Sequence, residues 1–351
     1  MSGFFSERYR DLRPYVPGEQ PLDRSYIKLN TNESPFPPSP LAQMMARREA
    51  GDLQLYSDPD CRALCAVAAE KLGCGKDGII FTNGSDEILF FAFAAFCGPD
   101  RPAVFPDITY GFYPVFAQLS RVPYRTVPLN GDLSVPVDSL CGCGGTVFLA
   151  NPNAPTGIAL PLRDVERIVA SNPGTVVVVD EAYVDFGAES AAGLIERYPN
   201  LLVTQTFSKS RSLAGGRLGF GLACPELIAD LQAVRFSMNP YNVNRMTMAA
   251  GIGALCDEAY FRECTEKIVA VRRSSAERLR ALGFELTDSS ANFLFVRHPS
   301  VGGEELCLRL REAGILVRHF DVPRIKDWNR ITVGSGEQMD ALIAALEVIL
   351  S

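Results

Sequence analysis

A lysine, Lys209, follows an apolar run directly and has hydroxyl residues on both sides, which is a setting where lysine can act chemically. The run Leu201-Leu-Val-Thr-Gln is typical of a buried strand, and Thr206-Phe-Ser-Lys209 follows it, with Gly-Gly-Arg217 further on. A lysine at the edge of an apolar sheet loses hydration, which lowers the pKa of its amine and frees it to attack a carbonyl group. The alternative interpretation is an ordinary loop lysine, and the rest of the chain has to decide between the two.

A carboxylate follows a second apolar run. Thr175-Val-Val-Val-Val-Asp180 contains four consecutive valines, which is typical of a strand covered on both faces in a parallel sheet. A carboxylate at that strand end is costly to bury unless it meets a cation, and a solvated strand end is the alternative. Because such sheets bind ligands beyond their strand ends, we expect Asp180 and Lys209 to share a site.

A strand-to-helix turn supplies a candidate anion site. The short apolar strand Ile79-Ile-Phe81 runs into Thr82-Asn-Gly84-Ser85-Asp86-Glu, and an apolar helix is predicted over 88–96. Ser85 or Asp86 is predicted to cap this helix, whose free N–H groups would face a phosphate; an ordinary capped turn without a ligand is the alternative. Tyr110 follows the predicted strand 102–106, and it would either stack on a planar ligand or pack in the core.

The helices and strands expected around these residues indicate three parts of the chain: a large domain, a smaller domain and an N-terminal arm. Strands and helices alternate over residues 36–240, which predicts a large α/β domain with a mixed, mostly parallel sheet between helices. Residues 241–351 predict a smaller α+β domain, with helices over 244–256, 258–282, 304–312 and 337–350 and strands over 292–296, 315–318 and 330–333. Residues 1–35 are rich in proline and predict an extended N-terminal arm; a disordered tail is the alternative.

Composition restricts the class of partner. The 351 residues carry a formal net charge of −7, which argues against nucleic acid as the main partner. The N-terminus shows no signal-peptide pattern, and the longest apolar stretches are too short to span a bilayer, so we expect a cytoplasmic protein. The ten cysteines are expected to be reduced thiols, and with only two histidines no metal site is predicted.

The motifs together resemble a known family. An aspartate after a buried strand, Tyr183 three residues on, a Ser-x-Lys element and an arginine eight residues beyond the lysine are similar to the fold-type I pyridoxal-phosphate enzymes of the aspartate aminotransferase superfamily. Within it, the chain is most similar to the histidinol-phosphate aminotransferase family. The matching stretches, in the family's order, are Lys28-Leu-Asn-Thr-Asn-Glu-Ser-Pro, Tyr56-Ser-Asp-Pro, Asn83-Gly-Ser-Asp-Glu, Asn151-Pro-Asn-Ala-Pro-Thr-Gly, Asp180-Glu-Ala-Tyr, Lys209 to Arg217, Ala291-Asn-Phe and Arg330-Ile-Thr-Val-Gly.

The resemblance implies the fold-type I transferase fold and pyridoxal 5′-phosphate as cofactor. It implies that Lys209 forms a Schiff base with the cofactor and then moves the proton. Asp180 would pair with the pyridine nitrogen, Tyr183 would donate to the phenolic oxygen, and Tyr110 would stack on the ring. The cofactor phosphate would be held by Gly84, Ser85, Asp86, Thr206, Ser208 and Arg217.

The resemblance also implies substrate contacts and a second subunit. Arg330 and Arg318 would bind the anionic end of the substrate, and Tyr15 and Asn32 of the arm would complete the substrate pocket. Tyr56 would reach the cofactor phosphate of the neighbouring subunit, which implies a homodimer with shared sites.

The sequence departs from the family at one position. The family has an asparagine directly before Pro-Thr-Gly, where it bonds the phenolic oxygen of the cofactor, and this chain has Ala154. Asn153 would replace that asparagine only if the loop is shifted; otherwise Tyr183 carries the contact alone.

The predicted reaction is amino transfer between histidinol phosphate and 2-oxoglutarate, giving imidazole acetol phosphate and glutamate, in histidine biosynthesis. A threonine-phosphate decarboxylase and an aromatic amino acid aminotransferase share the fold and stay open as alternatives. A non-catalytic regulator on this fold would carry a DNA-binding domain, and the chain has no basic helix-turn-helix segment. A nicotinamide dehydrogenase is disfavoured because Gly219-Phe-Gly221 and Gly251-Ile-Gly253 lack the last glycine of the dinucleotide pattern.

Overall fold

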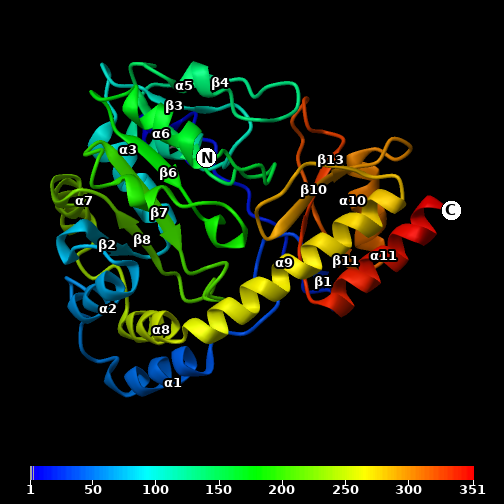
Figure 1. Ribbon diagram of the computed structural model, residues 1–351, viewed down its shortest axis with the longest axis horizontal. Helices are drawn as coiled ribbons and strands as arrows, with labels where there is room; N and C mark the ends of the chain where they lie inside the picture. Colours follow the sequence, from blue (N-terminus) through cyan, green and yellow to red (C-terminus); the bar gives the residue numbers. More distant parts are fainter. Residues whose placement is uncertain (1, 3) are drawn as a thin grey trace.

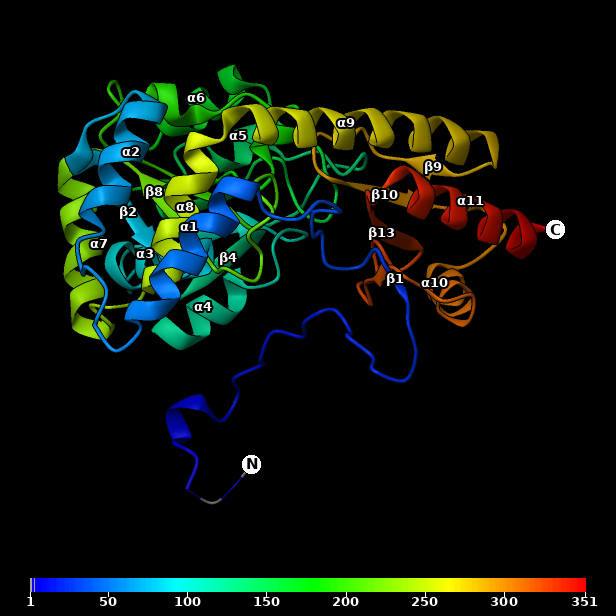
Figure 2. The ribbon, with the colours of Figure 1, turned by 90° about the horizontal axis from the view of Figure 1, so that it is seen from below.

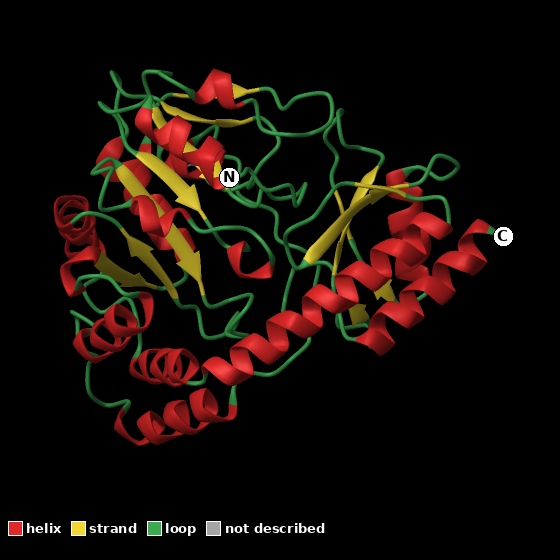
Figure 3. Ribbon diagram, viewed as in Figure 1, coloured by secondary structure: helices red, strands yellow, loops and turns green. Residues whose placement is uncertain are grey.

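A seven-stranded sheet forms the centre of the larger lobe in the computed structural model, which describes residues 2 and 4–351 (Figures 1 and 3). In spatial order the strands are β2 (Ile79–Thr82), β8 (Gly219–Leu222), β7 (Leu201–Thr206), β6 (Val177–Asp180), β5 (Thr146–Ala150), β3 (Ala103–Pro106) and β4 (Tyr124–Val127). Strand β8 runs antiparallel to both of its neighbours, and the other pairs are parallel. The prediction of a mixed, mostly parallel sheet is confirmed.

Both faces of this sheet are buried. Val177 and Val179 of β6 pack into one apolar cluster, and Val178 between them packs into the cluster on the opposite face. Successive side chains of a strand point to opposite faces, so a continuous run of valines fits a strand with a helical layer on each side. The interpretation of the valine run is therefore confirmed.

Helices form the outer layers, and they are visible around the sheet in Figure 1. Those of the larger lobe are α1 (Pro40–Glu49), α2 (Arg62–Leu72), α3 (Ser85–Phe96), α4 (Tyr113–Ser120), α5 (Val137–Leu140), α6 (Leu162–Ala170), α7 (Pro225–Met238) and α8 (Arg245–Cys256). Residues of α3, α4 and α7 share one core cluster, whereas residues of α2, α6 and α8 share the other.

The smaller lobe packs helices against an antiparallel sheet. The sheet has the order β12 (Arg318–His319), β13 (Trp328–Thr332), β10 (Phe293–Arg297) and β9 (Glu285–Leu286). Helices α10 (Gly303–Glu312) and α11 (Gly336–Leu350) complete its core, together with the long helix α9 (Glu258–Ala281), which runs from one lobe to the other in Figure 1. This arrangement confirms the predicted α+β character of the C-terminal part.

The division of the chain at residue 240 stays a prediction, and helix α8 bears on it. Ala250, Ala254 and Leu255 of α8 lie in the core cluster of the larger lobe, although they follow the predicted boundary. A Cβ on Gly253 would lie 2.6 Å from Cα of Ala42 in α1, so this glycine allows the two helices to pack closely.

The N-terminal arm extends outside the main body and then enters the space between the lobes (Figure 2, dark blue). It is not wholly irregular, because β1 (Ile27–Lys28) pairs in parallel with β11 (Ile315–Leu316). The single strand predicted over 315–318 is accordingly wrong: β11 pairs with the arm, while β12 joins the antiparallel sheet. The arm is thereby fixed to the smaller lobe just before Asn30, Thr31 and Asn32, which line the cavity described below.

Candidate active site

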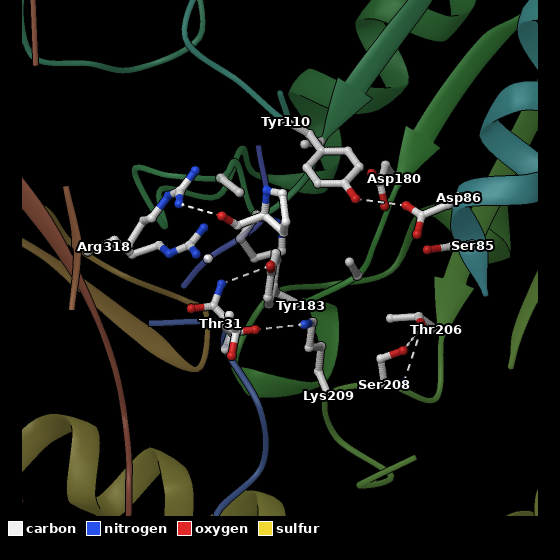
Figure 4. Close-up of a pocket in the computed structure, with 18 of the residues that line it drawn as sticks. Thr31, Ser85, Asp86, Tyr110, Asp180, Tyr183, Thr206, Ser208, Lys209 and Arg318 are labelled. Atoms are coloured by element: carbon white, nitrogen blue, oxygen red, sulfur yellow. Dashed lines mark hydrogen bonds between the residues drawn. The ribbon is translucent and has the colours of Figure 1, made fainter. Parts of the chain in front are cut away.

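The strand ends of the larger lobe, the arm and the smaller lobe enclose a cavity of about 230 Å³ (Figure 4). Most of the predicted site residues line it, although they are distributed from the arm to β13. Those on its wall are Tyr15, Asn32, Ser85, Asp86, Tyr110, Asp180, Tyr183, Thr206, Ser208, Lys209, Arg217, Arg318 and Arg330. Gly84 adjoins this wall, whereas Asn153 and Tyr56 are not part of it.

Lys209 follows β7 and projects into the cavity toward the arm (Figure 4). Its Nζ donates to the backbone oxygen of Thr31 over 3.3 Å. Burial and then the positive charge of Arg330 lower the pKa of Lys209 to about 8. A substantial fraction of its amine is therefore neutral near pH 8, as a nucleophile or a base requires.

Asp180 ends β6 and is 5% exposed. Its Oδ2 accepts a 3.0 Å hydrogen bond from the hydroxyl of Tyr113, while its buried Oδ1 has no hydrogen-bond partner among the described residues. Burial raises the pKa of Asp180 to about 7. An unpaired buried oxygen on the wall of a cavity is costly, and a cationic N–H donor on a ligand would remove that cost.

The start of α3 and the loop after β7 form a polar corner, in which Arg217 is paired with Asp86. Arg217 donates from Nη2 to Asp86 over 3.0 Å and from Nη1 to Ser208 Oγ over 3.4 Å, and the hydroxyls of Thr206 and Ser208 are 3.0 Å apart. Gly84 has a φ of 79°, and a Cβ there would lie 2.4 Å from Nη2 of Arg217. Only glycine fits this close approach, which lets the guanidinium lie against the first turn of α3.

The predicted cap of α3 is wrong. The helix begins at Ser85 and its N-cap is Gly84, without a side-chain capping bond. Ser85 and Asp86 are therefore the first helical residues, and the unpaired N–H groups of the first turn remain available to an anion.

Tyr110 lines the cavity near Asp180 and Asp86 (Figure 4). Its hydroxyl donates to Oδ1 of Asp86 over 2.7 Å, and its ring meets that of Tyr113 edge-on at 5.7 Å and lies 6.3 Å from that of Tyr15. The hydrogen bond fixes the ring orientation, so that a flat ligand between Tyr110 and the strand ends would have an aromatic neighbour.

Arg318 and Arg330 are cross-strand partners on β12 and β13. Arg318 donates to the backbone oxygens of Val16 and Pro17 over 2.8 and 3.1 Å, and Arg330 donates to that of Asn30 over 3.1 Å. Neither forms a salt bridge within residues 2 and 4–351. Like charges directly opposite each other repel, and an anion bound between the two guanidinium groups would remove this repulsion. The pair therefore forms a positively charged site suited to an anion.

The loop after β5 presents a methyl group where the family has an amide. Ala154 lines the cavity and packs in the same apolar cluster as Tyr183. Asn153 is turned away, because its Nδ2 donates to the backbone oxygen of Ile108 and to Thr156 Oγ1, and its Oδ1 accepts from Thr109. The prediction that Asn153 contacts the cofactor is therefore corrected: its amide is already bonded outside the cavity.

Tyr56 lies outside the cavity of its own chain. It is 79% exposed, and its ring stacks on that of Tyr241 at 4.4 Å. A tyrosine held in this way on the surface is available to another molecule and not to the site of its own subunit.

Sequence reasoning missed residues that contact the predicted site residues, among them Tyr113, Asn30 and Thr31. Tyr113 holds Asp180, and the backbone oxygens of Asn30 and Thr31 accept from Arg330 and Lys209. A tyrosine shortly after a predicted strand was a usable signal for Tyr113. Backbone acceptors carry no signal in residue type, so Asn30 and Thr31 had none.

Comparison with known proteins gives one family over nearly the whole chain. The model of the family "Aminotransferase class I and II" matches residues 24–346. Histidinol-phosphate aminotransferase 2 of Burkholderia mallei is 50% identical over 355 residues, which cover 100% of both chains. Histidinol-phosphate aminotransferase of Chromohalobacter salexigens is 48% identical over 350 residues, which cover 99% of both chains.

A solved structure agrees. Histidinol-phosphate aminotransferase from Sinorhizobium meliloti, in complex with pyridoxal-5′-phosphate, has a TM-score of 0.91 and 27% identity, and covers 100% of this chain and 98% of that one. The cavity between lobes, with a lysine and an aspartate at the strand ends, thus belongs to an aminotransferase fold. The chain is a member of the class I and II aminotransferase family.

Proposed function

We propose that the protein is a pyridoxal-phosphate-dependent aminotransferase that interconverts histidinol phosphate and 2-oxoglutarate with imidazole acetol phosphate and glutamate. The full-length identity of 50% to a histidinol-phosphate aminotransferase supports this reaction. The observation that carries the proposal is the arrangement of Lys209 and Asp180 on one cavity wall with the arginine pair on the other.

The residues present fit the cofactor. Oδ1 of Asp180 is buried without a partner and suits a protonated ring nitrogen, while Arg217, Ser208, Thr206 and the first turn of α3 suit a phosphate. When bound, pyridoxal phosphate supplies the aldehyde that takes up the amino group and the ring that absorbs electrons from the substrate.

The chain's own residues bind, orient and move a proton. Lys209 Nζ would hold the cofactor until the substrate amine displaces it. The freed amine, which its lowered pKa leaves partly neutral near pH 8, would then accept the proton from the substrate carbon that bears nitrogen and donate it to the carbon on the other side of that nitrogen. Tyr110 would cover the ring, Tyr183 would donate to its phenolic oxygen, and Tyr15 with the arm would exclude water from the cavity.

Arg318 and Arg330 select the anionic end of the substrate. Their guanidinium groups are bonded to neutral carbonyl oxygens of the arm, and a phosphate or a carboxylate offers a stronger, charge-assisted partner. The same pair therefore suits the phosphate of histidinol phosphate and the distal carboxylate of 2-oxoglutarate.

The test is a product assay on three substrates. Purified protein with pyridoxal phosphate should form glutamate from histidinol phosphate and 2-oxoglutarate, and no carbon dioxide from threonine phosphate. Carbon dioxide release without glutamate would instead support a decarboxylase, and faster transfer from L-phenylalanine would support an aromatic aminotransferase. In parallel, wild type should show a visible absorbance band that Lys209→Ala lacks; a protein without such a band contradicts the cofactor assignment.

The dehydrogenase alternative loses its sequence support. Gly219 and Gly221 lie within β8, and Gly251 and Gly253 lie within α8, so neither pair forms the turn between a strand and a helix that a dinucleotide requires. In particular, a Cβ on Gly251 would lie 2.4 Å from Leu218, which gives this glycine a packing role.

We further propose a cytoplasmic homodimer in which Tyr56 contacts the cofactor phosphate of the neighbouring subunit. The exposure of Tyr56 and its stacking on Tyr241 support this role. Within residues 2 and 4–351, no helix combines the length and the apolar character that a membrane span needs. Sedimentation should give a dimer, and Tyr56→Phe should weaken cofactor retention without changing the subunit's own fold.

A further inference from the structure

Tyr183 receives its polar contact from the arm and not from the loop after β5. On the loop side, the methyl group of Ala154 packs in the same apolar cluster as the tyrosine. On the arm side, Nδ2 of Asn32 donates to the Tyr183 hydroxyl over 2.9 Å, and Asn32 is 1% exposed. Asn32 thus provides an amide beside Tyr183 in a chain that lacks one at position 154.

Asn32 is held in place by its backbone. Its φ is 55°, a left-handed conformation that asparagine tolerates better than most residues. Its N–H donates to Thr332 Oγ1 over 2.9 Å, and its carbonyl oxygen accepts from Nδ2 of Asn292 over 3.0 Å. These bonds join the arm to β13 and to the residue before β10, so the backbone of Asn32 cannot change its conformation without breaking them.

The same bonds fix which end of the Asn32 amide faces Tyr183. Thr332 Oγ1 accepts from the Asn32 backbone, and its own hydrogen is directed to Oδ1 of Asn32, 3.1 Å away. With Oδ1 occupied by this donor, Nδ2 is the end that faces Tyr183. The amide therefore donates to the tyrosine oxygen and does not accept from it.

The hydrogen bond donated by the Asn32 amide determines the direction of the Tyr183 hydroxyl hydrogen. An oxygen that accepts from Asn32 keeps its own O–H for another acceptor. None of the described residues accepts this O–H, and Tyr183 lines the cavity, so the hydrogen is free to point there. Burial raises the pKa of Tyr183, so its hydroxyl stays protonated at neutral pH. Tyr183 is thereby presented to the cavity as a hydrogen-bond donor.

We propose that Asn32 is the positioning residue that directs the Tyr183 hydroxyl to the phenolic oxygen of the cofactor, and that it replaces in this way the asparagine missing at position 154. The inference rests on the proposed cofactor and reassigns Asn32, which was predicted to contact substrate. Asn32 acts through Tyr183, and the arm carries it into the site.

The test reads the bound cofactor and not the rate of the enzyme. The visible absorbance of the purified holoenzyme is titrated with pH for wild type, Asn32→Asp, Asn32→Ala, Tyr183→Phe and the double variant Asn32→Asp/Tyr183→Phe. An aspartate at 32 has the shape of asparagine but only accepts, so it draws the Tyr183 hydrogen away from the cavity. We expect its titration midpoint to move by about one pH unit in the direction found for Tyr183→Phe, since one hydrogen bond to the cofactor oxygen is lost in both.

Arg24→Ala is the matched control. Arg24 lies on the same arm, outside the cavity wall, and its Nη2 donates to the backbone oxygens of Arg311 and Glu312, so the variant loosens the arm without touching Tyr183. Its midpoint should equal that of wild type, and the double variant should move no further than Tyr183→Phe. Thermal unfolding checks that each variant is folded, and Asn32→Asp provides the result if Asn32→Ala does not fold.

Other outcomes overturn the inference. An unchanged midpoint in Asn32→Asp, shifts that add in the double variant, or an equal shift in Arg24→Ala would each mean that Asn32 does not act through Tyr183. A wild-type protein without the band that Lys209→Ala removes would instead contradict the proposed function, so the two failures are distinguishable.

Discussion

Asp180 and Glu181 are consecutive carboxylates at the end of β6, and they differ in how their oxygens are satisfied. Burial raises the pKa of each to about 7. Glu181 is 2% exposed and accepts from Ser190 Oγ, the backbone N–H of Ala191 and Nε2 of Gln205, at 2.6, 2.6 and 2.8 Å. Asp180 accepts from Tyr113 alone among the described side chains and keeps one oxygen unpaired at the cavity.

The difference shows what distinguishes a functional buried carboxylate from a structural one. Neither burial nor pKa separates the two residues, because both are nearly equal. The unpaired oxygen does, since of these two residues only Asp180 has a buried oxygen without a donor. Asp180 faces the cavity, whereas Glu181, the residue after β6, fixes the loop that carries Ser190.

The largest expected effect comes from Asp180→Asn. Removing the charge that faces the ring nitrogen should lower kcat for amino transfer by about 10³-fold, since an interaction worth roughly 4 kcal/mol in the transition state is lost. The cofactor-free variant should be at least as stable as wild type at pH 8, because a buried unpaired charge is gone. Steady-state kinetics and thermal unfolding measure both, and a variant that keeps wild-type kcat would contradict the role of Asp180.

Glu181→Ala should show the opposite pattern. It leaves the donors of Ser190, Ala191 and Gln205 without their acceptor, which should cost about 3 kcal/mol of unfolding free energy. The kcat of the folded variant should stay within several-fold of wild type, because Glu181 is not part of the cavity wall. Urea unfolding with parallel kinetics tests this, and a kcat loss as large as that of Asp180→Asn would erase the distinction.

The pH dependence of stability isolates the charge of Glu181. Its pKa is raised from 4.5 to about 7 on folding, so its contribution is fully present below pH 4.5 and is lost as the pH rises through 7. Against Glu181→Gln, cofactor-free wild type should therefore lose about 2 kcal/mol of unfolding free energy between pH 5 and pH 7. Urea unfolding at several pH values measures this difference, and parallel curves for the two proteins would mean that Glu181 is already ionised at pH 5.

Features that lie within one stretch of the sequence were predictable, whereas contacts between residues far apart in the chain were not. The four valines predicted a doubly covered strand, and that placed Asp180 and Lys209 at one sheet edge. The roles of the two acidic residues were not separable, because the partners of Glu181 lie on a loop and on β7 whose sequences carry no distinctive pattern. The Asn32–Tyr183 bond joins residues 151 positions apart, and only the path of the arm brings them together.

The position of Asn153 outside the site also depends on contacts between residues far apart in the chain. Its neighbours Ile108 and Thr109 belong to the loop after β3, which lies beside the loop after β5 in the sheet order. Residue type allowed Asn153 to reach the cofactor only if its loop were shifted, and its bonds to the neighbouring loop hold its amide outside the cavity.

The smallest expected effect is that of Ser190→Ala. Ser190 Oγ donates to Oε2 of Glu181 and accepts from the backbone N–H of Ala192 over 3.1 Å, so the variant removes one of the donors to Glu181 and a local cap. The loss should be about 1 kcal/mol of unfolding free energy, since the Ala191 N–H and Gln205 still satisfy the carboxylate. Its kcat should equal that of wild type. If the unfolding free energy falls as far as in Glu181→Ala, the Glu181 carboxylate depends on this one hydroxyl. Glu181 and Asp180 would then differ only in that Asp180 faces the cavity, and not in the number of hydrogen bonds that hold each carboxylate.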